Sequence, residues 1–289
     1  MQPFKRTRMK KIIFLLLCCL LVLTGCGEYN TVIKHGDPEY KYEVAKACYA
    51  KGKYLHAYDL LNSVVINFKG SSYGEECLYL MAMSAFKARD YDLASSGFKK
   101  YYQSYPRGLY VEESRYHSGL ALYESVPDPR LDQTATYQAI AELQNFLDYY
   151  PYTRLKEQTQ DMLQRLQDHL IDKEQRSAQL YYDLGNYIGN STSGGSNYEA
   201  CIVTSENALR DFPYASAERR EQFMLLILRS RYHLARQSVE EKRMQRFRQT
   251  VDEYYGFINE FPESAYRKEA EGYLKKSQKA LAGQPLDED

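Results

Sequence analysis

The sequence predicts an all-α protein, a solenoid of about five helical hairpins followed by a C-terminal capping helix. A segment that couples an aromatic residue to a helix stop recurs five times, and another aromatic residue stands about fourteen positions before each of them. The stretch from Tyr91 to Tyr105 carries aromatic and small side chains near helical spacing, which indicates an amphipathic helix rather than a strand. The aromatic pairs, in chain order, are Tyr54 with Phe68, Tyr91 with Tyr105, Tyr137 with Tyr150, Tyr198 with Phe212, and Phe247 with Phe261.

Proline follows the second aromatic residue in four of the five segments. Since proline cannot donate the helical hydrogen bond and forces its predecessor out of helical geometry, each helix should end there. The small or hydroxyl residue that comes next can cap the following helix. We therefore expect helix pairs at 38–51 with 53–68, 72–88 with 91–105, 109–125 with 132–150, 153–188 with 197–212, and 215–239 with 242–261, and a capping helix at 264–281.

The N-terminus has the pattern of an export signal. Five basic residues precede an unbroken apolar run, 12–23, which is too short to cross a membrane as a helix. The following Leu23-Thr24-Gly25-Cys26 resembles the bacterial lipobox, in which lipid is attached to the cysteine before cleavage. We expect residues 1–25 to be removed and Cys26 to carry the lipid, since several acyl chains hold a protein at a membrane almost permanently. The alternative is an ordinary cleaved signal with an incidental cysteine.

The predicted lipid anchor leads into a short segment with glycine and proline as punctuation, which we expect to be a flexible tether. Neither an aspartate next to Cys26 nor a run of acidic residues follows it, and by resemblance to known lipoprotein sorting signals this favours the periplasmic face of the outer membrane. The expected organisation is a signal peptide at 1–25, a lipidated tether at 26–37, the repeat solenoid at 38–281 with a Ser- and Gly-rich loop at 189–197, and an acidic tail at 282–289.

Charge and cysteine content narrow the class of protein. The whole chain has 38 basic and 38 acidic residues, so removal of the five basic residues of the signal leaves 33 against 38 and an acidic mature part. This argues against nucleic acid as a partner. Besides Cys26, the mature part contains only Cys48, Cys77 and Cys201, an odd number that does not form a disulfide framework. We expect small buried apolar side chains, with a bridge between Cys48 and Cys77 left open.

No pattern in the sequence indicates catalysis. The five histidines are scattered without metal-ligand spacing, and no candidate nucleophile stands beside a base. The acidic pairs Glu75-Glu76, Glu112-Glu113 and Glu240-Glu241 are expected to lie on solvated helix faces. We therefore predict no enzyme, no metal site, and no cofactor apart from the covalent lipid on Cys26, so that the function lies in binding.

The hairpins resemble the tetratricopeptide repeat. The second hairpin matches its signature at Ala94, Phe98 and Pro106, and the fourth at Tyr181, Leu184 and Gly185. In that fold the first helix of each hairpin lines a concave groove, so the resemblance implies an aromatic ladder there. Tyrosine offers a peptide a broad apolar face and a hydroxyl group, but the same rings could instead pack the repeats together. The residues concerned are Tyr42, Tyr49, Tyr79, Phe86, Tyr116 and Tyr123.

A second candidate surface is an arginine-rich stretch near the C-terminus. Its members include Arg236, Arg243 and Arg246, which we assign to partner docking. Glu240 and Glu241 interrupt the stretch, so a salt-bridged solvent face is the competing interpretation.

Lipobox, tether, hairpins and aromatic-proline junctions together resemble the BamD-type lipoproteins of the outer-membrane β-barrel assembly machinery. The resemblance runs from Cys26 to about Phe261 and is strongest from Phe68 to Tyr105. It implies a non-enzymatic scaffold on the periplasmic face of the outer membrane. Its C-terminal repeats would dock on the barrel-forming subunit, and its N-terminal repeats would receive unfolded barrel precursors. The loop 189–197 and the helix after Pro262 depart from the compact family pattern and leave the partner interface open.

Other binding functions compete with this one. A periplasmic tetratricopeptide adaptor of the cell-envelope or division machinery would share the proline junctions but needs no lipobox. A helical domain of a lytic transglycosylase would require a catalytic domain, for which the repeats leave no segment. A glycan-binding surface lipoprotein usually has Trp-lined sites, and this sequence contains no Trp.

Overall fold

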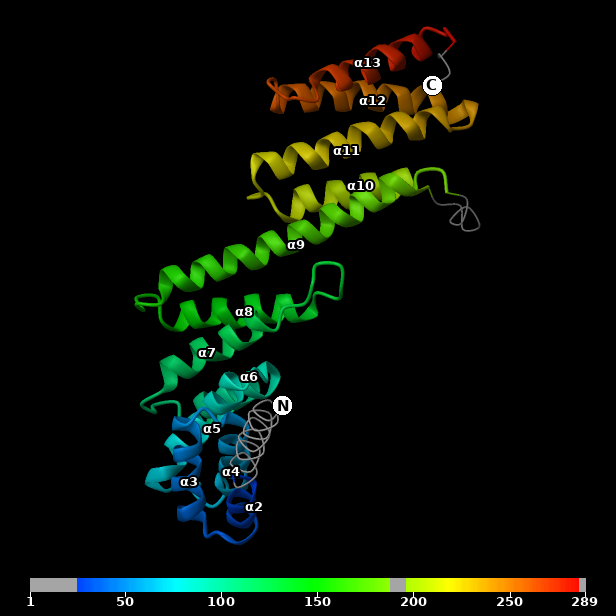
Figure 1. Cartoon of the computed structure of the whole chain (residues 1–289). Coiled ribbons are helices and arrows are strands. Elements are labelled where there is room, and N and C mark those ends of the chain that lie inside the picture. The colour runs from blue at the N-terminus through cyan, green and yellow to red at the C-terminus, as the bar shows by residue number, and fades with distance from the viewer. Residues whose placement is uncertain (1–24, 188–195, 286–289) are drawn as a thin grey trace, which may run out of the picture. The chain divides into compact units, whose positions relative to one another are not determined.

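The computed structural model describes residues 25–187 and 196–285, and within these ranges the chain forms twelve α-helices and no strand (Figure 1). The prediction of an all-α protein is therefore confirmed. The signal sequence, most of the predicted loop 189–197 and the end of the acidic tail lie outside the described residues.

The helices divide into two compact units by their contacts. Unit 1 comprises Met1–Val126 with Thr134–Leu163, and unit 2 comprises Pro127–Gln133 with Gln164–Asp289. In unit 1 each helix packs against the next (Figure 1). Its helices are α2 (Gly25–His35), α3 (Pro38–Ala50), α4 (Tyr54–Val64), α5 (Ser72–Lys87), α6 (Tyr91–Ser104), α7 (Val111–Glu124) and α8 (Thr134–Tyr149).

Unit 2 contains most of one long helix and four further helices. The long helix is α9 (Lys156–Leu184), whose first turns belong to unit 1. Ile171 and Ala178 of α9 are buried in one cluster with Cys201 and Phe223 of the following helices. The remaining helices are α10 (Asn197–Asp211), α11 (Ala217–Arg236), α12 (Glu240–Glu260) and α13 (Arg267–Leu281), and each packs against its successor.

The predicted helix stops have the backbone geometry that proline imposes. Tyr105, Phe212 and Phe261 follow the last residues of α6, α10 and α12, with φ between −127° and −123° and ψ between 65° and 68°. These angles lie outside the α-helical region, as expected for a residue that precedes proline. The aromatic ring and the proline therefore end the helix at the same point in three hairpins.

Hydroxyl residues accept backbone hydrogen bonds after four of these junctions. Thr153 and Ser264 accept from Leu155 and Tyr266, in the turns just before α9 and α13. Ser71 and Ser216 cap α5 and α11 themselves, as predicted, and accept from Tyr73 and Arg219. Such caps satisfy one of the backbone donors that the first helical turn leaves unpaired.

The two largest differences from the predicted helix ends, four residues each, have local reasons. Helix α4 ends at Val64 rather than at residue 68, in the one junction without proline, and the chain then turns through Gly70 at φ +83°. Helix α9 ends at Leu184 rather than at 188 because Gly185 adopts φ +45°, the left-handed conformation that commonly terminates helices.

The segment expected to be a flexible tether is helical, and this corrects the prediction for residues 28–37. Helix α2 covers Gly25–His35 and packs on the first hairpin. Val32 is 5% exposed within the core cluster formed with α3 and α4. The Tyr29 ring stacks on His56 at a centroid distance of 4.0 Å, and its hydroxyl donates to Asp59 at 2.9 Å. These tertiary contacts order a segment whose composition alone suggests a linker.

The three cysteines beyond Cys26 are free, so the Cys48 to Cys77 bridge is not formed. Cys77 and Cys201 are buried and Cys48 is half-buried. Burial raises the pKa of the Cys77 thiol to about 12. These side chains act as small apolar packing residues, as the sequence suggested.

Small residues permit close contact between helices. Ala57, Ala94 and Ala139 are completely buried. At Gly97 of α6, an added Cβ would lie 2.9 Å from the Cβ and 3.2 Å from the Cα of Ala82 on α5. The α5 and α6 backbones therefore approach more closely than any side chain at position 97 allows.

We predict opposite effects for one substitution at two helical glycines. Gly97→Leu should lower the free energy of unfolding by about 2 kcal/mol or more, because the backbone of α5 cannot withdraw without opening the hairpin. Gly256→Leu should be neutral or stabilising by up to about 1 kcal/mol, because a Cβ there meets nothing within 4 Å and leucine favours the helix. Urea unfolding followed by circular dichroism measures both. Equal losses at the two positions would contradict the close contact.

Candidate functional site

The structure divides the predicted aromatic ladder into buried and half-buried rings. Tyr42 and Tyr116 are only 2% and 5% exposed, so their rings are packing residues and have no face free for a peptide. Tyr49, Tyr79, Phe86 and Tyr123 are half-buried. A role in peptide binding therefore stays a prediction for these four side chains.

The half-buried rings of the ladder connect neighbouring hairpins. Tyr79 on α5 stacks on Tyr110 with ring centroids 4.3 Å apart, and its hydroxyl donates to Glu113 on α7 at 2.8 Å. Phe86 contacts His117 of α7 edge-on at 5.5 Å. Burial, followed by the hydrogen bond to Glu113, raises the pKa of Tyr79. Packing between repeats is thus the observed role of these two rings.

Several carboxylates that the sequence assigned to solvated faces are structural instead. Half-buried Glu75 in the first turn of α5 accepts hydrogen bonds from the Tyr101 hydroxyl and from the backbone N–H of Leu109. Glu112 in the first turn of α7 accepts from the Thr153 hydroxyl at 2.7 Å. Each carboxylate thus hydrogen-bonds the first helix of its hairpin to the segment that ends the same hairpin. Glu75 and Glu112 each stand seven residues after the aromatic residue that ends the preceding hairpin. This shared position is the sequence pattern that could have indicated their structural role.

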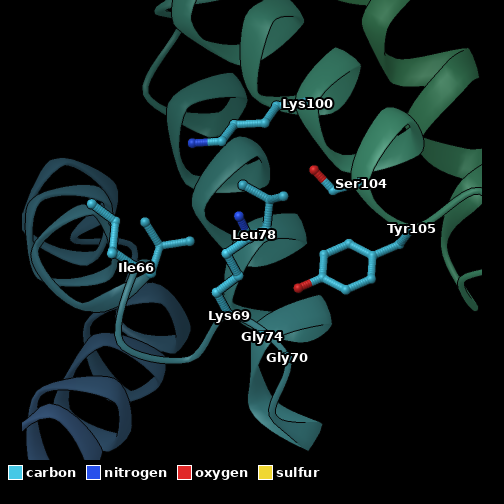
Figure 2. A pocket seen from close by; sticks show the side chains of 9 residues that line it. Ile66, Lys69, Gly70, Gly74, Leu78, Lys100, Ser104 and Tyr105 are labelled. Atoms are coloured by element: carbon cyan, nitrogen blue, oxygen red, sulfur yellow. The ribbon is translucent and has the colours of Figure 1, made fainter.

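A pocket of about 480 Å³ opens in unit 1 between α6 and the loop that joins α4 to α5, over the first turns of α5 (Figure 2). Its apolar lining comes from Val65, Ile66 and Leu78, and Ile66 is 80% exposed. Gly74 packs tightly at this site, since an added Cβ would overlap the Phe68 carbonyl oxygen and lie 2.8 Å from the Tyr105 hydroxyl. No pattern in the sequence indicates this pocket, because its walls come from two helices and the loop before them.

Two lysines give the pocket its charge. Lys69 lies in the loop before α5, and Lys100 extends from α6 across the pocket toward α4 (Figure 2). Neither ammonium group pairs with a carboxylate of the described chain. Apolar walls beside two unpaired cations suit a ligand segment with a large apolar side chain and a nearby negative group.

In unit 2, two arginines of the arginine-rich stretch form ion pairs between helices. Arg229 of α11 makes a bidentate pair with Glu269 of α13 at 2.7 and 2.8 Å. Arg231 joins α11 to α10 through Glu206 and to α12 through Glu253. The hydrogen bond to Arg229 lowers the pKa of Glu269, whereas burial raises the pKa of Glu253. For these two arginines the structure favours the salt-bridged interpretation.

The three arginines predicted to dock a partner lie at the junction of α11 and α12 and are half-buried. The Arg236 guanidinium lies 5.9 Å from the Tyr232 ring centroid. Arg243 pairs with Glu240 one turn earlier at 3.0 Å, and Arg246 donates to the Ser238 hydroxyl at 2.7 Å. Their positively charged groups occupy one end of unit 2, and their assignment to partner docking remains a prediction.

More than half of the chain matches the model of a known protein family. The YfiO family, described as outer membrane lipoprotein, matches residues 34–192, which is 159 of 289 residues. The chain belongs to the YfiO family of outer membrane lipoproteins. No match is found among curated proteins.

The region matched to the YfiO family runs from the end of α2 to the residues after α9. It contains the pocket and all six ladder residues but not α10 to α13. Among residues 25–187 and 196–285, no helix is both long and apolar enough to span a bilayer. Attachment of lipid to Cys26, the second residue of α2, stays a prediction.

We predict that this YfiO-family protein loses stability in alkali. Folded Tyr79 keeps its proton at a pH where unfolded tyrosines, with a pKa of 10.0, ionise, so the free energy of unfolding falls as pH rises above that value. Urea unfolding at pH 8 and at about pH 10.5 measures the loss. Tyr79→Phe should reduce it by about 0.8 kcal/mol. Tyr152→Phe is the control, because its ring is 97% exposed; equal effects at both sites would contradict the assignment.

Proposed function

We propose that this protein is a non-enzymatic, lipid-anchored scaffold of the outer-membrane β-barrel assembly machinery. Lipid on Cys26 holds it at the periplasmic face of the outer membrane. Unit 1 receives unfolded β-barrel precursors, and unit 2 docks on the barrel-forming subunit. Membership of the YfiO family supports the outer-membrane location, and the pocket of unit 1 is the observation that carries the binding role.

The pocket suits an unfolded precursor because its recognition groups are few and general. A β-strand places alternate side chains on opposite faces, so an extended segment can insert one large side chain while its neighbours remain outside. The Val65, Ile66 and Leu78 side chains would contact the inserted residue. Lys69 and Lys100 would attract a carboxylate of the same segment. Such a site accepts many sequences, which a receptor for different barrel precursors requires.

The docking role of unit 2 rests on its charge and on its rigidity. Interhelical ion pairs of Arg229 and Arg231 hold α10 to α13 together. Positive charge at the junction of α11 and α12 is then held by helices that are fixed to their neighbours. It comes from Arg236, Arg243 and Arg246. Charge of this kind speeds association with an acidic partner surface and makes binding sensitive to salt.

We predict that precursors contact the pocket directly. A photo-crosslinking amino acid in place of Ile66, which is 80% exposed in the pocket wall, should capture an unfolded barrel precursor. The same group in place of Tyr152 should capture little, although that side chain is 97% exposed. Lys69→Glu with Lys100→Glu should weaken capture at Ile66 by about tenfold, as expected for two charge-assisted contacts. Crosslinking that is equal at both positions would contradict the site.

We predict a separate effect of unit 2 on recovery of the barrel-forming subunit from mild detergent extracts. Arg243→Glu reverses a charge at the proposed docking end and should reduce recovery by about fivefold, a typical loss for a charge reversal at an interface rim. Arg248→Glu makes the same change at an exposed position of the same helix and should not reduce recovery. If a division protein or a transporter is recovered in place of the barrel-forming subunit, the proposed function is wrong.

A further inference from the structure

Because α2 is helical, a helix rather than a flexible linker connects the predicted lipid on Cys26 to the repeats. Tyr29 of α2 contacts His56 and Asp59, which lie in the first two turns of α4. Cys26 precedes Tyr29 by three residues, or about 4.5 Å of helix rise. The lipid would therefore be attached beside the N-terminal end of α4.

The same end of unit 1 carries the turn between α3 and α4. Tyr29 and Val32 form a hollow of about 210 Å³ with Lys51, Lys53 and His56. A second hollow beside it is lined by Lys53, Leu55 and Ala88, the last from the turn between α5 and α6. The two turns thus lie next to each other and next to the start of the polypeptide segment that bears Cys26.

The exposed side chains of these turns are mainly basic, with one leucine among them and the carboxylates of Asp90 and Asp92 beside Arg89. Lys51 and Lys53 are exposed and form no ion pair within the described chain, and Leu55 is 64% exposed. Lys87 and Arg89 add positive charge at the end of α5. Two nearby carboxylates are engaged, since Asp59 accepts from Tyr29 and Asp90 caps α6. Cationic groups around an exposed leucine suit an anionic lipid surface.

We propose that the turn from Lys51 to Leu55 rests on the phospholipid headgroups of the membrane that holds the Cys26 lipid. Weak attraction suffices, because the anchor keeps the turn at a high effective concentration near the bilayer. The contact would fix the orientation of unit 1, with the opposite hairpin ends directed away from the lipid. This inference rests on the lipid anchor of the proposed function.

The absence of Trp from the sequence allows a single-site test. Leu55→Trp places a fluorophore on the proposed lipid contact, and Leu109→Trp places one at the opposite hairpin ends on a side chain that is 82% exposed. Lipidated protein is reconstituted into vesicles of phosphatidylethanolamine and phosphatidylglycerol with brominated acyl chains. Quenching of the Leu55→Trp protein should exceed that of the Leu109→Trp protein by about twofold or more, because bromine quenches only at short range.

Charge variants and flotation distinguish the contact from the anchor. Lys51→Gln with Lys53→Gln should reduce quenching of Leu55→Trp, while Arg107→Gln at the opposite end should not. Vesicles of phosphatidylcholine alone should also give less quenching. Flotation of the vesicles reports the anchor by itself, and Cys26→Ala should abolish it. Intact flotation with equal quenching at the two Trp positions would overturn the lipid contact and leave the anchor standing. Loss of flotation in the unaltered protein would instead refute the anchor.

Discussion

The architecture depends on one backbone constraint, the conflict between proline and the helical conformation of the residue before it. At Tyr105, Phe212 and Phe261 this conflict ends a helix with nearly identical backbone angles. The next helix begins within a few residues of each stop, and at α11 the Ser216 hydroxyl caps its first turn. These stops lie at the ends of three hairpins, where the next helix of the chain begins. The end of each of these hairpins is therefore encoded locally.

Contacts between hairpins then decide which surfaces remain available. Rings that the ladder offers to a groove, such as Tyr79, are occupied in joining α5 to α7, and Glu75 and Glu112 hold the hairpin ends together. In unit 1 the pocket and the exposed basic turn both lie at ends of the hairpins, away from these aromatic faces. One end carries the pocket with Lys69 and Lys100, and the other carries the turn beside the predicted lipid. A precursor site and a membrane contact on opposite ends would not compete for the same surface.

The sequence located the helices to within a few residues because their boundaries arise from short-range chemistry. The errors at α4 and α9 occurred where proline is absent or where glycine intervenes, so the stop depends on how the chain turns. The candidate binding residues of unit 1 could be predicted less well than the helices. Tyr42 and Tyr116 occupy ladder positions yet are buried, because burial depends on how closely the next hairpin approaches. The pocket has no signature in the sequence, since Ile66, Leu78 and Lys100 meet only after α5, α6 and the loop before α5 have packed together.

By itself, the sequence determined the helical class, the repeated hairpins and the capping residues, because a proline or a hydroxyl group acts on backbone within a few residues of itself. It also supplied the resemblance that the match to the YfiO family supports. Only the tertiary structure decided that residues 25–35 form a helix, that Glu75 is a structural acceptor and that two lysines face an open pocket. These features require side chains distant in sequence to be brought within contact distance, and no local pattern fixes that distance.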